Sequence, residues 1–215
     1  MNNPLEKQRF CRQINIGAMS SGAPVGSNVQ LVVVFGRPGA GKTTIADAVI
    51  EKVGSELALG LDLDVCIPQW MKDNFSKGIY PTLKQRHEFM AEACHYVQDK
   101  IDQTTAKVVL VSFSFVNIDL RNGFREAFPH AKWALVDTTE QEAELRIQQR
   151  QGHFYTGAPS SEKEKPVEME TKSGENNDKD NSEWLFAPVT FQHTILPGAA
   201  SIENNAQTII EILEL

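Results

Sequence analysis

Short runs of apolar, β-branched residues alternate along the chain with longer segments whose apolar residues recur three or four positions apart. Short apolar runs bounded by turn residues are typical of strands buried in a parallel sheet, and the longer spacing is typical of amphipathic helices. The runs predict five strands, at residues 30–35, 57–61, 107–113, 132–137 and 193–196. The spacing predicts a helix at 42–53 and a mixed helical stretch that follows the second strand and ends at about residue 77. It also predicts helices at 82–101, 119–128, 140–151 and 201–213.

This alternation predicts the α/β fold class, with a five-stranded parallel sheet between two layers of helices. Two helix starts carry the hydroxyl side chains that commonly cap helices. We expect Thr138 or Thr139 to cap the helix at 140–151, and Ser201 to cap the last helix.

Two segments depart from the alternation. Residues 1–28 are polar and end in the Ser-, Gly- and Pro-rich stretch "MSSGAPVGSN", which predicts a flexible N-terminal extension. Residues 158–183 hold eight acidic and four basic residues and almost nothing apolar. Such a segment cannot bury enough surface to offset its ordering entropy, so we expect a mobile insertion. One domain is therefore predicted over residues 29–215, interrupted by this insertion.

Composition narrows the classes of partner. The formal charge is −7 and the isoelectric point is near 5.3, which disfavours nucleic acid because such partners usually need a basic face. No apolar run approaches the roughly 18–20 residues of a membrane span, and the N-terminus lacks the apolar core of a secretion signal. The three cysteines are far apart in the sequence and form no paired motif, so we interpret them as free thiols of a protein in a reducing compartment. We expect a cytoplasmic protein that acts on a small molecule.

The strongest motif follows the first predicted strand, in the stretch "FGRPGAGKTT". It contains the pattern G-x-x-x-x-G-K-[ST], in which glycines let a loop turn its N–H groups toward phosphates. The lysine then reaches the β- and γ-phosphates, and the hydroxyl can bind Mg²⁺. We predict that ATP and Mg²⁺ bind here, and we expect Lys42 to be catalytic as well. We assign nucleotide binding to Gly36, Arg37, Pro38, Gly39, Ala40, Gly41, Lys42, Thr43 and Thr44.

Two carboxylates follow the second predicted strand, Asp62 and Asp64 in "LDLD". A spacing of two in an extended segment aims both side chains the same way, and strand carboxyl ends open onto the ligand crevice of such sheets. One carboxylate can then hold Mg²⁺ while the other accepts a proton from an acceptor hydroxyl. A helix cap beside a solvated acid is the alternative that these residues leave open.

Two arginines lie four residues apart after the fourth predicted strand, Arg146 and Arg150. Their guanidinium groups suit a nucleotide or a transferring phosphoryl group, and we expect Arg150 to be catalytic. A solvated basic helix face is the alternative.

The stretches "GRPGAGKTT", "LDLD", "GIYP" and "RQGHFY" occur in an order and spacing that resemble the gluconate kinases. These belong to the small-molecule kinases with the nucleoside-monophosphate-kinase-like fold, together with shikimate kinase. The resemblance covers about residues 30–157 and the terminal helix. It implies transfer of the γ-phosphate of ATP to a hydroxyl of a sugar acid such as gluconate, and a possible homodimer.

The resemblance also implies individual roles. Asp64 would be the catalytic base, and Thr43 with Asp62 would hold Mg²⁺. Arg86 would bind a substrate carboxylate, and Arg150 would lie in a lid that the insertion enlarges. Two residues of the loop after the last strand, Pro197 and Gly198, would lie beside adenine.

Departures from the gluconate kinase pattern fall on the acceptor side. Ser114 is kept after the third strand, but Asn117 and Ile118 replace a basic pair, with Arg121 nearby as the substrate-binding cation. No Walker-B aspartate follows that strand. A shikimate-like acid, a nucleoside or an antibiotic are therefore alternative acceptors, and a nucleotide-binding module with little catalysis is a further alternative.

Overall fold

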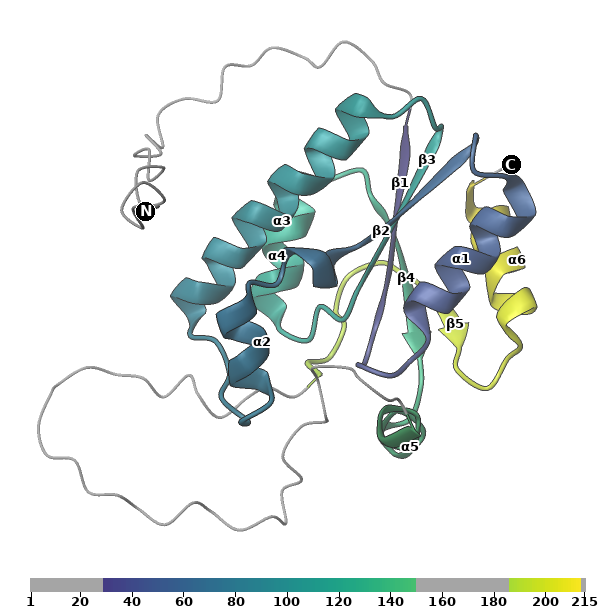
Figure 1. Cartoon of the computed structure of the whole chain (residues 1–215). Coiled ribbons are helices and arrows are strands. Elements are labelled where there is room, and N and C mark those ends of the chain that lie inside the picture. The colour runs from purple at the N-terminus through teal and green to yellow at the C-terminus, as the bar shows by residue number, and fades with distance from the viewer. Residues whose placement is uncertain (1–28, 150–185, 214–215) are drawn as a thin grey trace, which may run out of the picture.

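Five parallel strands form one sheet in the order β2-β3-β1-β4-β5 in the computed structural model, which describes residues 29–149 and 186–213 (Figure 1). The register pairs β1 with β3 on one side and with β4 on the other. The strands are β1 Gln30–Gly36, β2 Ala58–Asp62, β3 Val108–Phe113, β4 Lys132–Asp137 and β5 Thr194–Pro197.

Helices connect these strands in the predicted alternation, which confirms the α/β class with its five-stranded parallel sheet. None of the helices in the described residues combines the length and the apolar character that crossing a membrane requires. The predicted extension at 1–28, the insertion at 158–183 and the end of the helix expected at 140–151 lie outside the described residues. The helices are α1 Lys42–Val53, α2 Gln69–Phe75, α3 Leu83–Gln103, α4 Ile118–Ala127, α5 Glu140–Gln149 and α6 Ile202–Leu213.

The sheet separates two hydrophobic cores. Successive side chains of β1 point to opposite faces, so Val33 and Phe35 pack with α3 and α4, whereas Val32 and Val34 pack with α1 and α6. Figure 1 shows these two helix pairs on either side of the strands. Burial on both faces explains why the strand sequences are continuously apolar.

Helix starts follow the predicted capping chemistry. The Thr139 hydroxyl accepts a hydrogen bond from the Glu142 N–H at 3.3 Å, and the Glu142 carboxylate accepts one from the Thr139 N–H. Ser201 Oγ accepts from the Asn204 N–H. Thr139 and Ser201 are thus confirmed as caps.

The segment after β2 differs from the extended geometry predicted for Asp62 and Asp64. β2 ends at Asp62, and the short 3-10 helix η2, Leu63–Cys66, begins at once. Asp62 Oδ1 caps that helix by accepting a hydrogen bond from the Asp64 N–H at 3.0 Å. The prediction that both residues lie in one extended segment is wrong, because an aspartate can bond the backbone two residues on and so favours a turn.

Candidate active site

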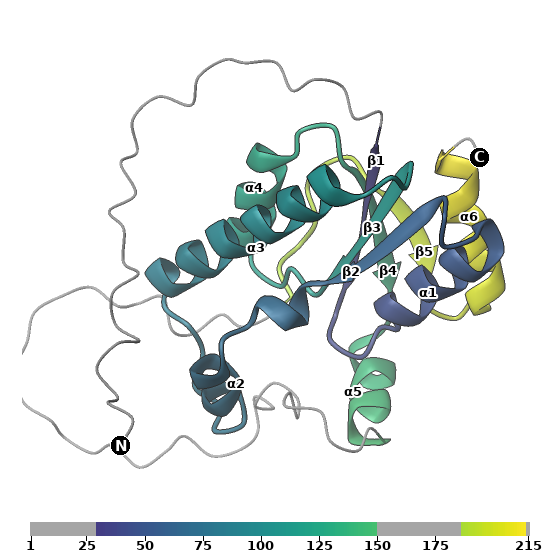
Figure 2. The same ribbon diagram turned by 45° about the horizontal axis from the view of Figure 1, so that its top comes forward.

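The phosphate loop, residues 36–44, joins β1 to α1 at the carboxyl edge of the sheet, with α2 on one side and α5 on the other (Figure 2). Gly39 has φ +83°, and a Cβ there would lie 2.5 Å from the Ala143 carbonyl oxygen of α5. Both the backbone conformation and this close approach therefore require glycine. Lys42 Nζ donates a hydrogen bond to the Arg37 carbonyl at 2.9 Å, so its ammonium lies against the loop that it is expected to serve.

Oxygen atoms from three elements meet beside the phosphate loop. Thr43 Oγ1 donates to Asp62 Oδ2 at 2.9 Å and lies 3.4 Å from the hydroxyl of Ser112. Ser112 stands opposite Asp62 in the register of β3 with β2. Hydroxyl and carboxylate oxygens suit Mg²⁺, which keeps several waters and takes few protein ligands. The arrangement fits the predicted pair of metal residues and adds Ser112, which the sequence analysis did not identify.

Asp64 lies on η2, half-buried, one short turn beyond the oxygens of Thr43, Asp62 and Ser112. Cys66 follows two residues later. Burial, followed by the negative charges of Glu92 and Asp62, raises the pKa of the Cys66 thiol. This thiol therefore stays protonated at neutral pH, which makes Asp64 the stronger candidate for proton transfer at this strand end.

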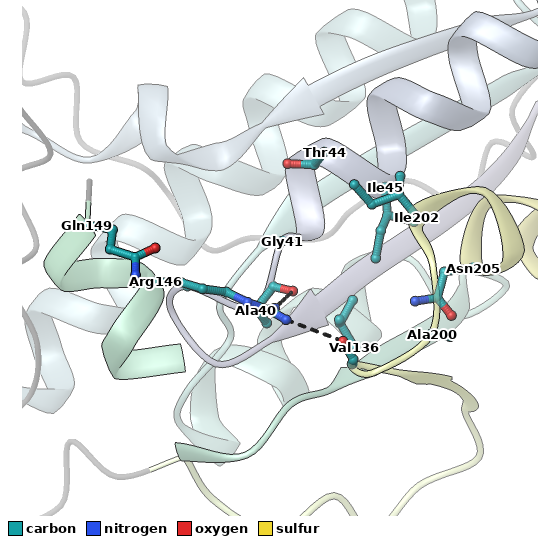
Figure 3. A pocket seen from close by; sticks show the side chains of 12 residues that line it. Ala40, Gly41, Thr44, Ile45, Val136, Arg146, Gln149, Ala200, Ile202 and Asn205 are labelled. Atoms are coloured by element: carbon teal, nitrogen blue, oxygen red, sulfur yellow. Dashed lines mark hydrogen bonds between the residues drawn. The ribbon is translucent and has the colours of Figure 1, made fainter. Parts of the chain in front are cut away.

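A cavity of about 470 Å³ opens on the other side of the phosphate loop, between α5, α6 and the loop after β5 (Figure 3). Gly41, Thr44, Ile202 and Asn205 contribute to its wall. Arg146 reaches into it from α5, donating to the Ala40 carbonyl at 3.2 Å and the Gly198 carbonyl at 3.3 Å. The cavity therefore joins the phosphate loop to the predicted adenine loop.

The loop that follows β5 is fixed closely against the end of β4. Gly198 donates its N–H to the Asp137 carbonyl at 2.7 Å, and a Cβ on Gly198 would lie 2.6 Å from that same oxygen. Pro197 accepts a hydrogen bond from the buried Asn205 side chain. Pro197 and Gly198 thus lie in one rigid turn beside the cavity.

Arg86 does not present its charge to solvent. Its Nε donates to Asp119 Oδ2 at 2.8 Å, and its Nη1 donates to the Pro81 carbonyl at 3.0 Å. The side chains of Arg86 and Asp119 are 6% and 20% exposed, so the pair is largely buried. The residue predicted to bind a substrate carboxylate is therefore already paired with a carboxylate of the chain.

Arg121 lies on α4 in the interior at 2% exposure, facing the segment that leads to β5. Its guanidinium donates to four backbone carbonyls, and burial lowers its pKa to about 10. In this structure the side chain predicted to contact the substrate holds backbone together instead, because its donors are taken by buried carbonyls. These carbonyls belong to Phe115, Val116, Ala187 and Pro188.

Ser114 is half-buried in the loop after β3. Arg150, the predicted catalytic arginine, lies outside the described residues.

Comparisons with known proteins agree with this arrangement. A family described as an AAA domain, AAA_33, matches residues 31–169, which include the phosphate loop and the strands β1 to β4. No curated protein matches the chain significantly.

Solved kinase structures share the fold. A sugar kinase from Janibacter sp. HTCC2649 is 19% identical, with a TM-score of 0.61 over 86% of this chain and 95% of its own. The Mycobacterium tuberculosis APS kinase in complex with AMPPNP and APS is 19% identical, with a TM-score of 0.58 over 87% and 98%. A gluconokinase from Sinorhizobium meliloti 1021 is 18% identical, with a TM-score of 0.53 over 86% and 93%.

Proposed function

This chain belongs to the AAA_33 family of AAA domains, and from that premise we propose that it is an ATP-dependent phosphotransferase acting on a hydroxyl of a small metabolite. The observation that carries the proposal is the meeting of Thr43, Asp62 and Ser112 beside the phosphate loop, with Asp64 one turn away. A nucleotide-binding module would need only the phosphate loop. The second carboxylate at the end of β2, Asp64, is what a kinase needs in addition, to take the proton of an attacking hydroxyl.

On the donor side, the loop amides and Lys42 bind the phosphates of ATP, and Arg146 borders the cavity for the nucleoside. Thr43 and Asp62 would hold Mg²⁺, with Ser112 close enough to orient the Thr43 hydroxyl. When bound, the metal neutralises phosphate charge. The chain's contribution is position and electrostatics, which carry most of the catalysis in phosphoryl transfer.

On the acceptor side, Asp64 accepts the proton of the attacking hydroxyl. Its backbone is fixed by the Asp62 cap, which holds η2 at the end of β2. A general base of this kind accelerates the reaction by about 10²- to 10⁴-fold.

A sugar acid such as gluconate is the first candidate acceptor, supported by the sequence motifs. The Arg86–Asp119 pair favours a second candidate, an uncharged hydroxyl compound such as a nucleoside. A substrate carboxylate would have to replace the Asp119 carboxylate at Arg86, which a neutral acceptor does not require.

A panel of sugar acids, polyols and nucleosides, scored by acceptor-dependent release of ADP, tests the proposal. We expect slow ATP turnover alone and a marked increase with one acceptor class. Lys42→Ala should abolish both activities. Equal ADP release with every compound and with none would instead favour the nucleotide-binding module.

A further inference from the structure

Arg37 occupies a variable position of the phosphate loop, yet its side chain has a defined place. Its carbonyl accepts the hydrogen bond from Lys42 Nζ, so the Arg37 backbone lies where the lysine ammonium ends. Because that ammonium is expected to reach the β- and γ-phosphates, the backbone of Arg37 lies at the γ-phosphate end of the loop.

The Arg37 guanidinium lies over the ring of Phe186, with 5.4 Å between its carbon and the ring centroid. A cation over an aromatic face at this distance is attracted by the ring quadrupole. Phe186 also stacks against Phe35 of β1, with 6.5 Å between centroids and an interplanar angle of 28°. The ring is therefore supported by the sheet, and it limits where the guanidinium can go.

Arg121 fixes the same ring from within the fold. Its guanidinium carbon is 4.5 Å from the Phe186 centroid, and its Nη1 donates to the carbonyls of Ala187 and Pro188 at 2.8 and 3.0 Å. The Ala187 N–H in turn donates to the Val116 carbonyl at 3.0 Å. Phe186 is thus tied to the loop that follows β3.

That loop carries backbone strain. Phe115 has φ 45° although it is buried and bulky, and Arg121 Nε donates to its carbonyl at 2.7 Å. Strained conformations of this kind cluster at functional sites, where the surrounding structure holds them. Ser114, on the acceptor side, is the neighbouring residue.

Arg37 has no carboxylate partner in the described part of the chain. The ion pairs there join Lys84 to Glu88, Arg86 to Asp119 and His95 to Asp99. A half-buried guanidinium at the phosphate end of the loop is therefore available to an anion.

We propose that the Arg37 side chain is a second cation of the phosphoryl-transfer site, contacting the γ-phosphate, and that Phe186, held by Arg121, is its positioning residue. This inference rests on the proposed function and adds a role for two residues, Phe186 and Arg121, that the resemblance to gluconate kinases does not supply. It also gives the buried Arg121 a part in the site without contact to the substrate.

Calorimetric binding of AMPPNP and of ADP, each with Mg²⁺, to the full chain tests the inference without an acceptor. Arg37→Ala should weaken AMPPNP binding by about 10- to 100-fold, the range of a lost charge-assisted contact, and leave ADP binding within about twofold. Phe186→Leu should show the same selective loss to a smaller degree, and Phe186→Tyr, which keeps the ring, should bind like the wild type.

Arg125→Ala is the matched control. The guanidinium carbon of Arg125 lies 4.4 Å from the ring centroid of Phe191. This variant therefore removes a similar contact between an arginine and an aromatic ring of the segment that leads to β5. It should leave the ratio of the two affinities unchanged.

An unchanged ratio in Arg37→Ala would overturn the inference while leaving the proposed function intact. Equal weakening of both nucleotides in Phe186→Leu would make Phe186 a structural residue only and overturn its positioning role. If Phe186→Leu failed to fold, Arg37→Ala would still decide the role of Arg37, and loss of selectivity in Phe186→Tyr would overturn that of Phe186. A wild-type chain that bound neither nucleotide would overturn the proposed function itself.

Discussion

The phosphate loop with Asp62 and the proposed acceptor side with Arg86 and Arg121 use their polar side chains differently. Around the loop, Thr43 is exposed and Asp62 is half-buried, and their oxygen atoms meet at the end of the sheet. On the acceptor side, the two arginines are 5% and 2% exposed, and they bind a carboxylate and backbone carbonyls of the chain itself. A basic residue at a motif position can thus hold the site together without touching a substrate.

The largest effect should come from Asp64→Asn. Loss of the general base should lower kcat by about 10²- to 10⁴-fold while the affinity for ATP stays the same, because Asp64 lies beyond the phosphate loop. Steady-state kinetics with the best acceptor and a nucleotide titration measure the two quantities. Asp73→Asn, on exposed Asp73 of α2, is the control, and a kcat equal to that of the wild type would remove Asp64 from the role of base.

Asp119→Ala should have the next largest effect, and it should lower the free energy of unfolding. Removing the partner leaves the buried Arg86 charge uncompensated, which should cost about 2–3 kcal/mol, below the range for fully buried pairs because Asp119 is partly exposed. Urea unfolding measures it. Asp99→Ala, which breaks the exposed His95–Asp99 pair, should change stability by less than about 1 kcal/mol. Unchanged stability with a lowered KM for a carboxylated acceptor would instead assign Arg86 to substrate binding.

Ser112→Ala should have the smallest effect and should act on the metal. Without the Ser112 hydroxyl, the Thr43 hydroxyl loses a polar neighbour 3.4 Å away. The Mg²⁺ concentration for half-maximal activity should therefore rise about fivefold, equivalent to about 1 kcal/mol. Ser114→Ala, on the acceptor side, should leave the Mg²⁺ dependence unchanged. If the two variants shifted it equally, the division between the two sides would fail.

The donor side could be predicted from the sequence because its geometry is local. One loop between a strand and a helix carries most of its residues, and Gly41 and Lys42 follow from the motif alone. Asp62 could be placed near Thr43 because the carboxyl ends of parallel strands meet at one edge. Ser112 obeys the same rule, but a single hydroxyl in an apolar strand carries no motif.

The acceptor side could not be predicted because its contacts are distant in sequence. Arg86 and Asp119 are 33 residues apart, and Arg121 binds a carbonyl 67 residues away. Neither pairing leaves a periodic signal, and an arginine that binds carbonyls has the same sequence signature as one that binds a substrate. Asp64 shows a smaller failure of prediction, because the Asp62 cap places a turn where an extended segment was expected.

Transfer of label from γ-labelled ATP into organic phosphate tests the central claim most directly. The full chain is incubated with Mg²⁺, labelled ATP and a mixture of small metabolites, and the products are separated by chromatography. We predict a labelled organic phosphate with the wild type and none with Lys42→Ala. Label that appeared only as inorganic phosphate, at the same rate with and without the metabolites, would contradict the assignment as a small-molecule kinase.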